Sequence, residues 1–145
     1  MISVRAGRCG LCYSIRVSSI NPPARVLVVE DEALIAIVLQ DMLEELGWEV
    51  VGPASTLAEA RTLADDATSY DLALLDVRLN GETVFPVAER IAAAGRPIIF
   101  ATGSGGDDLP SSIPASSVLG KPYAAETVER AILKALDEAR TVHAS

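Results

Sequence analysis

The sequence predicts a single α/β domain built on a doubly wound parallel β-sheet. Short apolar runs of strand length alternate regularly with segments that have helical spacing, which is the pattern of βαβ units. The apolar runs are continuous, with little polar alternation, as expected for strands covered by helices on both faces. The chain of 145 residues has the length of one domain, and half of its residues are hydrophobic, so it can bury a substantial core.

The first half of this pattern begins after the break Asn21-Pro22-Pro23. Residues 25–30 (RVLVVE) form the first strand, and residues 48–54 (WEVVGPA) form the second. A helix is predicted over 33–46 and ends at Gly47, and a short Ala-rich helix over 55–67 has Ser55 as its N-cap. The apolar face of the 33–46 helix consists of Ile35, Leu39, Met42, Leu43 and Leu46.

The second half continues with strands at 71–76 and 96–103 and a weak fifth strand at 117–122. A helix is predicted over 83–94, where Pro86 is tolerated because it lies in the first turn. The last helix, 124–139, is amphipathic and carries Val128, Ile132, Leu133 and Leu136. The connection GSGGDDLPSSIPASS is rich in Gly, Pro and Ser, so a degenerate fourth helix is expected there.

Composition excludes several classes of function. The net charge of the chain is −8. From residue 25 onward there are nine basic and twenty acidic residues, which gives a net charge of −11. Such a surface disfavours binding to nucleic acid or to anionic membranes. No apolar run reaches the roughly 18 residues of a membrane span, and Arg8 and Arg16 interrupt any signal-peptide core. A cytoplasmic protein is therefore expected.

The two cysteines, Cys9 and Cys12, form a C-x-x-C pair near the N-terminus. A structural zinc site needs four ligands, and His143 is the only histidine. A redox pair would follow a strand and open a helix, whereas this pair lies in a Gly/Ser/Arg-rich leader. We interpret residues 1–24 as a poorly ordered leader with two free thiols, residues 25–140 as the folded domain and residues 141–145 as a tail.

Polar residues gather where the predicted strands end. The first strand ends in Glu30-Asp31-Glu32, the third in Asp76, the fourth in Thr102-Gly103 and the fifth in Lys121-Pro122. In a doubly wound sheet, ligands bind beyond the carboxyl ends of the strands. An unpaired carboxylate at the end of an apolar strand is costly to bury, so Asp76 calls for a cationic partner at this edge.

These residues suit magnesium-assisted phosphoryl transfer. Mg²⁺ prefers oxygen ligands, so we predict that Asp31 and Asp76 bind it directly, that Glu30 assists through water, and that the backbone carbonyl of Arg78 completes the site. Asp76 is then the nucleophile that forms an aspartyl-phosphate. Two further side chains would bind phosphoryl oxygens, namely Lys121 as a point charge and Thr102 through its hydroxyl.

Simpler roles are open for each of these residues. Glu30 and Asp31 could cap the first helix, Asp76 could be an ordinary strand-end or cap carboxylate, and Thr102 could be only a β-branched strand residue. Lys121 could be a solvated surface lysine, and the side chain of Arg78 is expected to have no role.

The motifs VLVVEDE, LALLDVRLNGE, FATG and GKPY resemble the receiver domain of two-component response regulators, and the resemblance covers about residues 24–140. The resemblance implies five parallel strands in the order 2-1-3-4-5, the flavodoxin-like receiver fold, flanked by five helices. It implies that Asp76 accepts phosphate from a histidine kinase or phosphotransfer protein, and that Glu30 and Asp31 bind Mg²⁺. It also implies that Thr102 and Lys121 respond to the phosphoryl group, and that the Lys121-Pro122 bond is cis.

The sequence departs from the family pattern at two places. Val118 stands where receivers carry a switch Tyr or Phe, three residues before the lysine. FATG is similar to the FAT GUY subgroup of single-domain receivers, but Ser104 and Gly105 replace the hydrophobic residue and Tyr that continue that motif.

We expect a stand-alone receiver that signals to an unknown downstream protein by contact, as a monomer or weak homodimer, through rearrangement of Gly103–Ser117 on phosphorylation. The main alternative is a phosphorylation-independent scaffold with the same fold. A phosphatase of the haloacid-dehalogenase type is disfavoured because Arg78 replaces its second Asp, and a flavin-binding protein is disfavoured because Glu30-Asp31-Glu32 would repel an anion.

Overall fold

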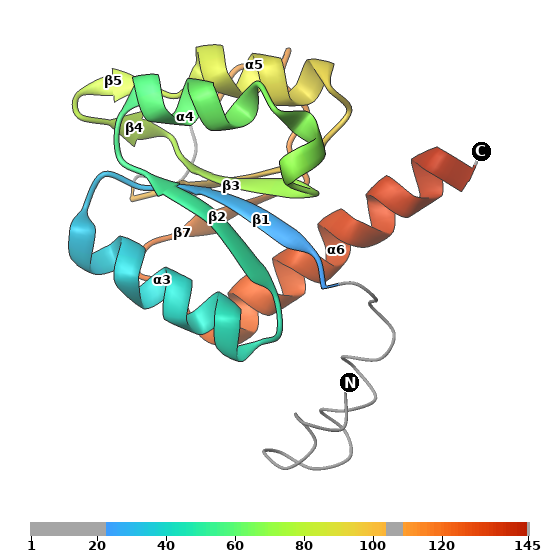
Figure 1. Cartoon of the computed structure of the whole chain (residues 1–145), viewed down its shortest axis with the longest axis horizontal. Helices are drawn as coiled ribbons and strands as arrows, with labels where there is room; N and C mark the ends of the chain where they lie inside the picture. Colours follow the sequence, from blue (N-terminus) through green and yellow to red (C-terminus); the bar gives the residue numbers. More distant parts are fainter. Residues whose placement is uncertain (1–22, 104–108, 145) are drawn as a thin grey trace.

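The computed structural model describes residues 23–103 and 109–144, and within the last helix the side chains up to residue 139. A single five-stranded parallel sheet forms the middle layer (Figure 1). Its strand order is β2-β1-β3-β6-β7, which confirms the predicted 2-1-3-4-5 order. The strands are β1 (Arg25–Val29), β2 (Glu49–Ala54), β3 (Leu72–Asp76), β6 (Ile98–Thr102) and β7 (Ser117–Gly120).

Helices cover both faces of the sheet, as the continuous apolar strands predicted. α3 (Ala33–Glu45) and α6 (Ala125–Ala144) lie on one face, and α4 (Leu57–Ala64) and α5 (Phe85–Ala93) lie on the other (Figure 1). The core is accordingly split in two by the sheet. One half includes Leu39, Leu43, Val128 and Ile132 beneath α3 and α6, and the other includes Ala60, Val87, Ile91 and Phe100 beneath α4 and α5.

The register of the parallel pairs brings the predicted polar residues to one edge. β3 pairs with β6 so that Asp76 lies beside Ala101, and β6 pairs with β7 so that Thr102 lies beside Gly120. Asp76 and Thr102 are therefore the last residues of their strands. Lys121 directly follows β7, with its N–H donating to the carbonyl oxygen of Thr102 at 3.2 Å.

The predicted helix boundaries need correction at three places. The second helix begins at Leu57, and its N-cap is Thr56, whose hydroxyl accepts from the N–H of Glu59 at 3.1 Å, whereas Ser55 was predicted to be the cap. It ends at Ala64 and is followed by a short 3₁₀ turn at Ala67–Ser69. The last helix continues to Ala144, five residues beyond its predicted end at 139.

The third correction concerns a hairpin that the sequence pattern did not reveal. β4 (Arg78–Leu79) and β5 (Glu82–Thr83) pair antiparallel around Asn80-Gly81, so α5 begins at Phe85 and the predicted start at residue 83 is wrong. Pro86 does lie in the first turn of α5. The hairpin projects at the same end of the sheet as the connection from β1 to α3 (Figure 1).

Other predictions fall partly outside the described residues. The connection after β6 contains no helix in its described part, residues 109–116, which agrees with a degenerate fourth helix. Cys9, Cys12, Ser104 and Gly105 lie outside the described residues. Within 23–103 and 109–144, no helix is long and apolar enough to span a membrane.

Candidate functional site

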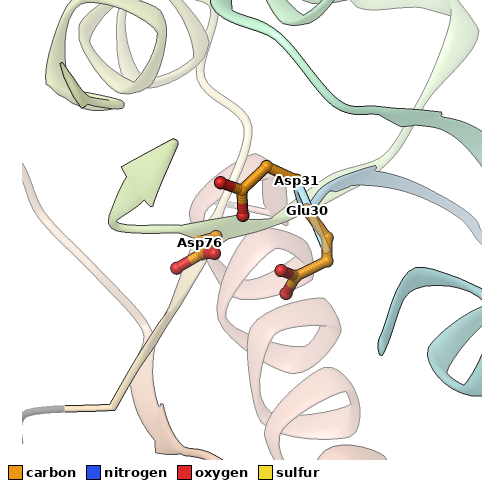
Figure 2. A group of neighbouring side chains, drawn as sticks. All are labelled: Glu30, Asp31 and Asp76. Atoms are coloured by element: carbon orange, nitrogen blue, oxygen red, sulfur yellow. The ribbon is translucent and has the colours of Figure 1, made fainter. Parts of the chain in front are cut away.

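Three carboxylates converge at the carboxyl edge of the sheet. Glu30 and Asp31 come from the end of β1, and Asp76 comes from the end of β3 (Figure 2). One oxygen of each lies within 4.8 Å of the others. Glu30 is 1% exposed and Asp76 6% exposed, so two of the three negative charges are almost removed from water. The arrangement requires positive charge nearby.

Lys121 supplies part of that charge. Its ammonium nitrogen lies 2.9 Å from Oδ2 of Asp76 and 3.2 Å from Oε1 of Glu30. The preceding strand β7 and a cis Lys121-Pro122 peptide bond place the lysine there, and the cis bond is as predicted. Three carboxylates against one ammonium leave a formal charge of −2, which a divalent cation would balance.

The pKa values of the site reflect this crowding. Burial raises the pKa of Glu30, and the neighbouring charge of Asp76 adds to the effect, while the N–H of Glu32 and the charge of Lys121 oppose it. Burial alone would lower the pKa of Lys121, but its hydrogen bond to Asp76 and the charges of Asp76 and Glu30 outweigh burial and raise that pKa. Lys121 is therefore held in its charged form.

Glu30 has two further contacts that argue against a helix-capping role. Its Oε2 accepts from the N–H of Glu32 at 3.2 Å, and its Oε1 accepts from the hydroxyl of Tyr123 at 3.5 Å. The N-cap of α3 is Glu32, which makes no capping hydrogen bond through its side chain. The motif GKPY contains Tyr123, but its contact with Glu30 spans 93 positions in the chain and does not follow from the sequence.

Asp31 is held by the hairpin that follows β3. Its Oδ2 accepts from the N–H of Asn80 at 2.9 Å, so it belongs to the acidic site and does not cap α3. The side chain of Arg78 is exposed. Sequence reasoning does not place Asn80 in the site, because its contact with Asp31 spans 49 positions in the chain.

Thr102 and Val118 come from β6 and β7, the two strands that follow β3 in the order of the sheet. Thr102 ends β6, is 6% exposed, and is joined through its carbonyl to the N–H of Lys121. Val118, which replaces the family's switch aromatic, is 43% exposed on β7. The structure thus brings Glu30, Asp31, Asp76 and Lys121 into one cluster, with Thr102 at the end of the adjacent strand.

The fold and this acidic edge define the class of protein. Residues 26–133 match the model of the response regulator receiver domain, and the chain belongs to that family. Receiver domains are signalling modules that bind Mg²⁺ in an acidic site of this kind and interact with histidine kinases or phosphotransfer proteins.

Individual relatives support the same assignment. The chain is 35% identical over 126 residues to the transcriptional regulatory protein PdtaR of Mycobacterium tuberculosis, an alignment that covers 84% of this chain and 61% of PdtaR. The chain thus spans less than two thirds of that relative. It is 40% identical to SdrG of Sphingomonas melonis Fr1, with a TM-score of 0.70 and coverage of 81% of this chain and 99% of SdrG.

A second solved structure shares the fold. The receiver domain of the sensor histidine kinase PA1611 from Pseudomonas aeruginosa has a TM-score of 0.70 at 24% identity, covering 79% of this chain and 98% of its own. In that protein a magnesium ion is coordinated in the active-site cleft.

Proposed function

We propose that this chain is a phosphoacceptor receiver that takes a phosphoryl group on Asp76 from a histidine kinase or histidine phosphotransfer protein in a Mg²⁺-dependent reaction. The observation that carries the proposal is the setting of Asp76. It is a strand-end carboxylate bonded to Lys121 at 2.9 Å and grouped with Glu30 and Asp31 within 4.8 Å. Burial, a cationic partner and an acidic pair beside one carboxylate suit phosphoryl transfer better than they suit a structural role.

The donor set fits a hard divalent cation. All three side chains offer carboxylate oxygens, and Mg²⁺ is bound in proteins by one or two carboxylates with water and phosphate oxygens. Asp31 and Asp76 would bind it directly, Glu30 through water, and the backbone carbonyl of Arg78 would complete the set. When bound, Mg²⁺ neutralises negative charge on the phosphoryl oxygens.

The transfer is a displacement at phosphorus. An oxygen of Asp76 attacks the phosphorus of the donor's phosphohistidine, a P–O bond forms, and the P–N bond breaks with its electron pair going to the imidazole, which then takes a proton. Lys121 moves from the carboxylate to a phosphoryl oxygen, and the hydroxyl of Thr102 donates to another. Loss of the signal is hydrolysis, in which water attacks phosphorus and the Asp76 carboxylate leaves.

The donor protein must dock close to Asp76, because the reacting atoms must come within roughly 3–3.5 Å. The face of α3 beside the site carries three exposed apolar side chains, Leu34, Ile37 and Val38, which are 78%, 55% and 56% exposed. We name these three residues the α3 surface. A groove of about 250 Å³ joins Leu34 and Val38 to Lys121, Pro122 and Tyr123.

The groove makes the α3 surface continuous with the phosphoryl-binding lysine. Exposed apolar residues that lie beside a reactive site mark a place where a protein partner binds. We therefore assign the α3 surface to the phosphohistidine-bearing donor. The signal would then pass to a downstream protein through a population shift that follows the movement of Thr102.

The first test is phosphorylation by phosphoramidate or acetyl phosphate with and without Mg²⁺, followed by intact mass. A gain of one phosphoryl group that requires Mg²⁺ and is lost in Asp76→Ala is expected. Asp41→Ala, at an exposed carboxylate on α3, is the matched control and should be phosphorylated like the unmodified chain. A gain that persists in Asp76→Ala would show that another residue is the acceptor.

The second candidate function is a receiver-like scaffold that works without phosphorylation. It is favoured by Val118, because the aromatic residue that usually reports phosphorylation is missing. If neither a small donor nor a histidine phosphotransfer protein phosphorylates the chain, that result would support the scaffold and overturn our proposal.

A further inference from the structure

Asn80 lies at the tip of the β4–β5 hairpin, in a backbone conformation that few residues adopt. Its φ is 55°, and that of the following Gly81 is 84°, so both central residues of the turn are left-handed. This is the type I′ turn that a two-residue hairpin prefers, and Asn-Gly is its most favourable sequence. The turn type explains why Asn is favoured at position 80. It does not explain which groups the N–H and the side-chain amide of Asn80 bind.

Asn80 joins three connections at the carboxyl edge of the sheet. Its main-chain N–H donates to Oδ2 of Asp31 at 2.9 Å, and its side-chain amide donates to the carbonyl oxygen of Ser55 at 3.0 Å. Asp31 precedes α3, and Ser55 directly follows β2. One residue therefore ties the hairpin both to the acidic cluster and to the loop on its other side.

The hairpin also sets the position of Arg78. The N–H of Val84 donates to the carbonyl of Val77 at 2.9 Å, so Val77 and Val84 are a hydrogen-bonded pair. Hydrogen-bonded and non-hydrogen-bonded pairs alternate in an antiparallel ladder, so the next pair, Arg78 with Thr83, is not hydrogen-bonded. The Arg78 carbonyl consequently points away from Thr83. Where that carbonyl lies relative to Asp31 and Asp76 depends on how the hairpin is anchored.

We propose that Asn80 is a positioning residue for divalent-cation binding. Its N–H fixes one oxygen of Asp31 and leaves the other oxygen for the cation, while its side-chain amide anchors the hairpin to Ser55. The two bonds hold ligands from the β1–α3 connection and from the hairpin in a single geometry before the cation arrives. This inference rests on the proposed function, because it concerns the same metal site.

The residue type matters for the side-chain bond to Ser55, because the bond to Asp31 is made by the main chain. A Gly at position 80 would keep the left-handed turn and the N–H to Asp31, but it would remove the anchor to Ser55. Asn80→Gly is therefore the variant that separates anchoring from turn formation. Thr83→Ala is the matched control, because it alters the same hairpin and leaves both Asn80 bonds in place.

The experiment is calorimetric titration of Mg²⁺, and separately of Mn²⁺, into the unmodified chain, Asn80→Gly and Thr83→Ala, with amide NMR spectra to confirm the fold. Partners that orient metal ligands typically contribute 10–100-fold to metal affinity. We expect about tenfold weaker binding in Asn80→Gly and unchanged binding in Thr83→Ala. Phosphorylation of Asn80→Gly by phosphoramidate should need more Mg²⁺ but reach the unmodified rate at saturation.

The outcomes separate this inference from the function on which it rests. If the unmodified chain binds Mg²⁺ and Asn80→Gly binds it equally well, the positioning role is wrong and the receiver function stands. Equal weakening in Asn80→Gly and Thr83→Ala would also overturn it, because general loosening of the hairpin would then be the cause. If the unmodified chain binds neither cation, the proposed metal-dependent function itself fails, and this inference fails with it.

Discussion

The ammonium of Lys121 lies 2.9 Å from Oδ2 of Asp76, so the carboxylate that we propose as the phosphoacceptor is already paired with a cation in the unphosphorylated chain. The same ammonium lies 3.2 Å from Oε1 of Glu30, and the side chain of Lys121 is only 17% exposed. One lysine therefore offsets the charges of two nearly buried carboxylates. This relationship gives Lys121 a structural role in the metal-free chain beside its proposed role in phosphoryl binding.

Replacing Lys121 should destabilise the metal-free chain. In Lys121→Met, Glu30 and Asp76 lose their shared partner, and leaving buried polar groups unpaired costs about 1–3 kcal/mol. We expect the free energy of unfolding to fall by about 2 kcal/mol. Urea denaturation in the presence of a chelator measures it.

Mg²⁺ should restore much of this loss, because a divalent cation neutralises the same carboxylates. Lys121→Arg, which keeps the charge, is the control and should lose less stability than Lys121→Met. A chain whose stability did not respond to Lys121→Met would show that solvent, rather than Lys121, compensates the two carboxylates.

The α3 surface should matter for transfer from a protein donor only. Val38→Ser, alone or with Leu34→Ser, removes exposed apolar area beside the site, so transfer from a phosphohistidine protein should slow by about tenfold, equivalent to about 1.4 kcal/mol of lost binding. Phosphorylation by phosphoramidate should not change. Leu133→Ser on α6, where the side chain is 39% exposed, is the matched control. Equal slowing with both kinds of donor would contradict the docking assignment.

The fold was predictable because its strands are buried on both faces. LALLD in β3 and IIFAT in β6 are fully buried, and such strands are continuous apolar runs in the sequence. The cluster of Glu30, Asp31, Asp76 and Lys121 was predictable because parallel strands end at one edge. Strand order alone brings residues together there, whatever their separation in the chain.

The contacts of Asn80 and Tyr123 could not be predicted in the same way. Each strand of the hairpin is two residues long, too short for a periodic pattern, although Asn80-Gly81 is a strong turn signal. What Asn80 binds depends on Asp31 and Ser55, which are 49 and 25 positions away. The partial exposure of the apolar residues on α3 likewise depends on how far α6 and the sheet cover it.

Thr102 should be needed for the response to phosphorylation more than for stability. Thr102→Val keeps the β-branched shape but removes the hydroxyl, so we expect a loss of about 1 kcal/mol in unfolding free energy and slower uptake from phosphoramidate. Amide NMR shifts on phosphorylation should become confined to the neighbourhood of Asp76. Thr102→Ser keeps the hydroxyl and should retain the wider shifts. Wide shifts in Thr102→Val would show that another group transmits the signal.

The start of α4 should make a pH-dependent contribution to stability. Oε1 of Glu59 accepts from the N–H of Ser55 at 2.8 Å and from the hydroxyl of Ser55 at 3.1 Å. These two hydrogen bonds lower the pKa of Glu59 from its ordinary value of 4.5. A carboxylate whose pKa is lower in the folded state than in the unfolded state stabilises the fold when the pH is above the unfolded-state pKa. This stabilisation is lost as the pH falls through the folded-state pKa. Urea denaturation should therefore show the unmodified chain to be more stable than Glu59→Gln at neutral pH, with the difference closing as the pH falls below 4.5. Ser55→Ala, which keeps the N–H and removes only the hydroxyl donor, should lose part of the difference, and a gap that did not change with pH would show that the charge of Glu59 contributes nothing.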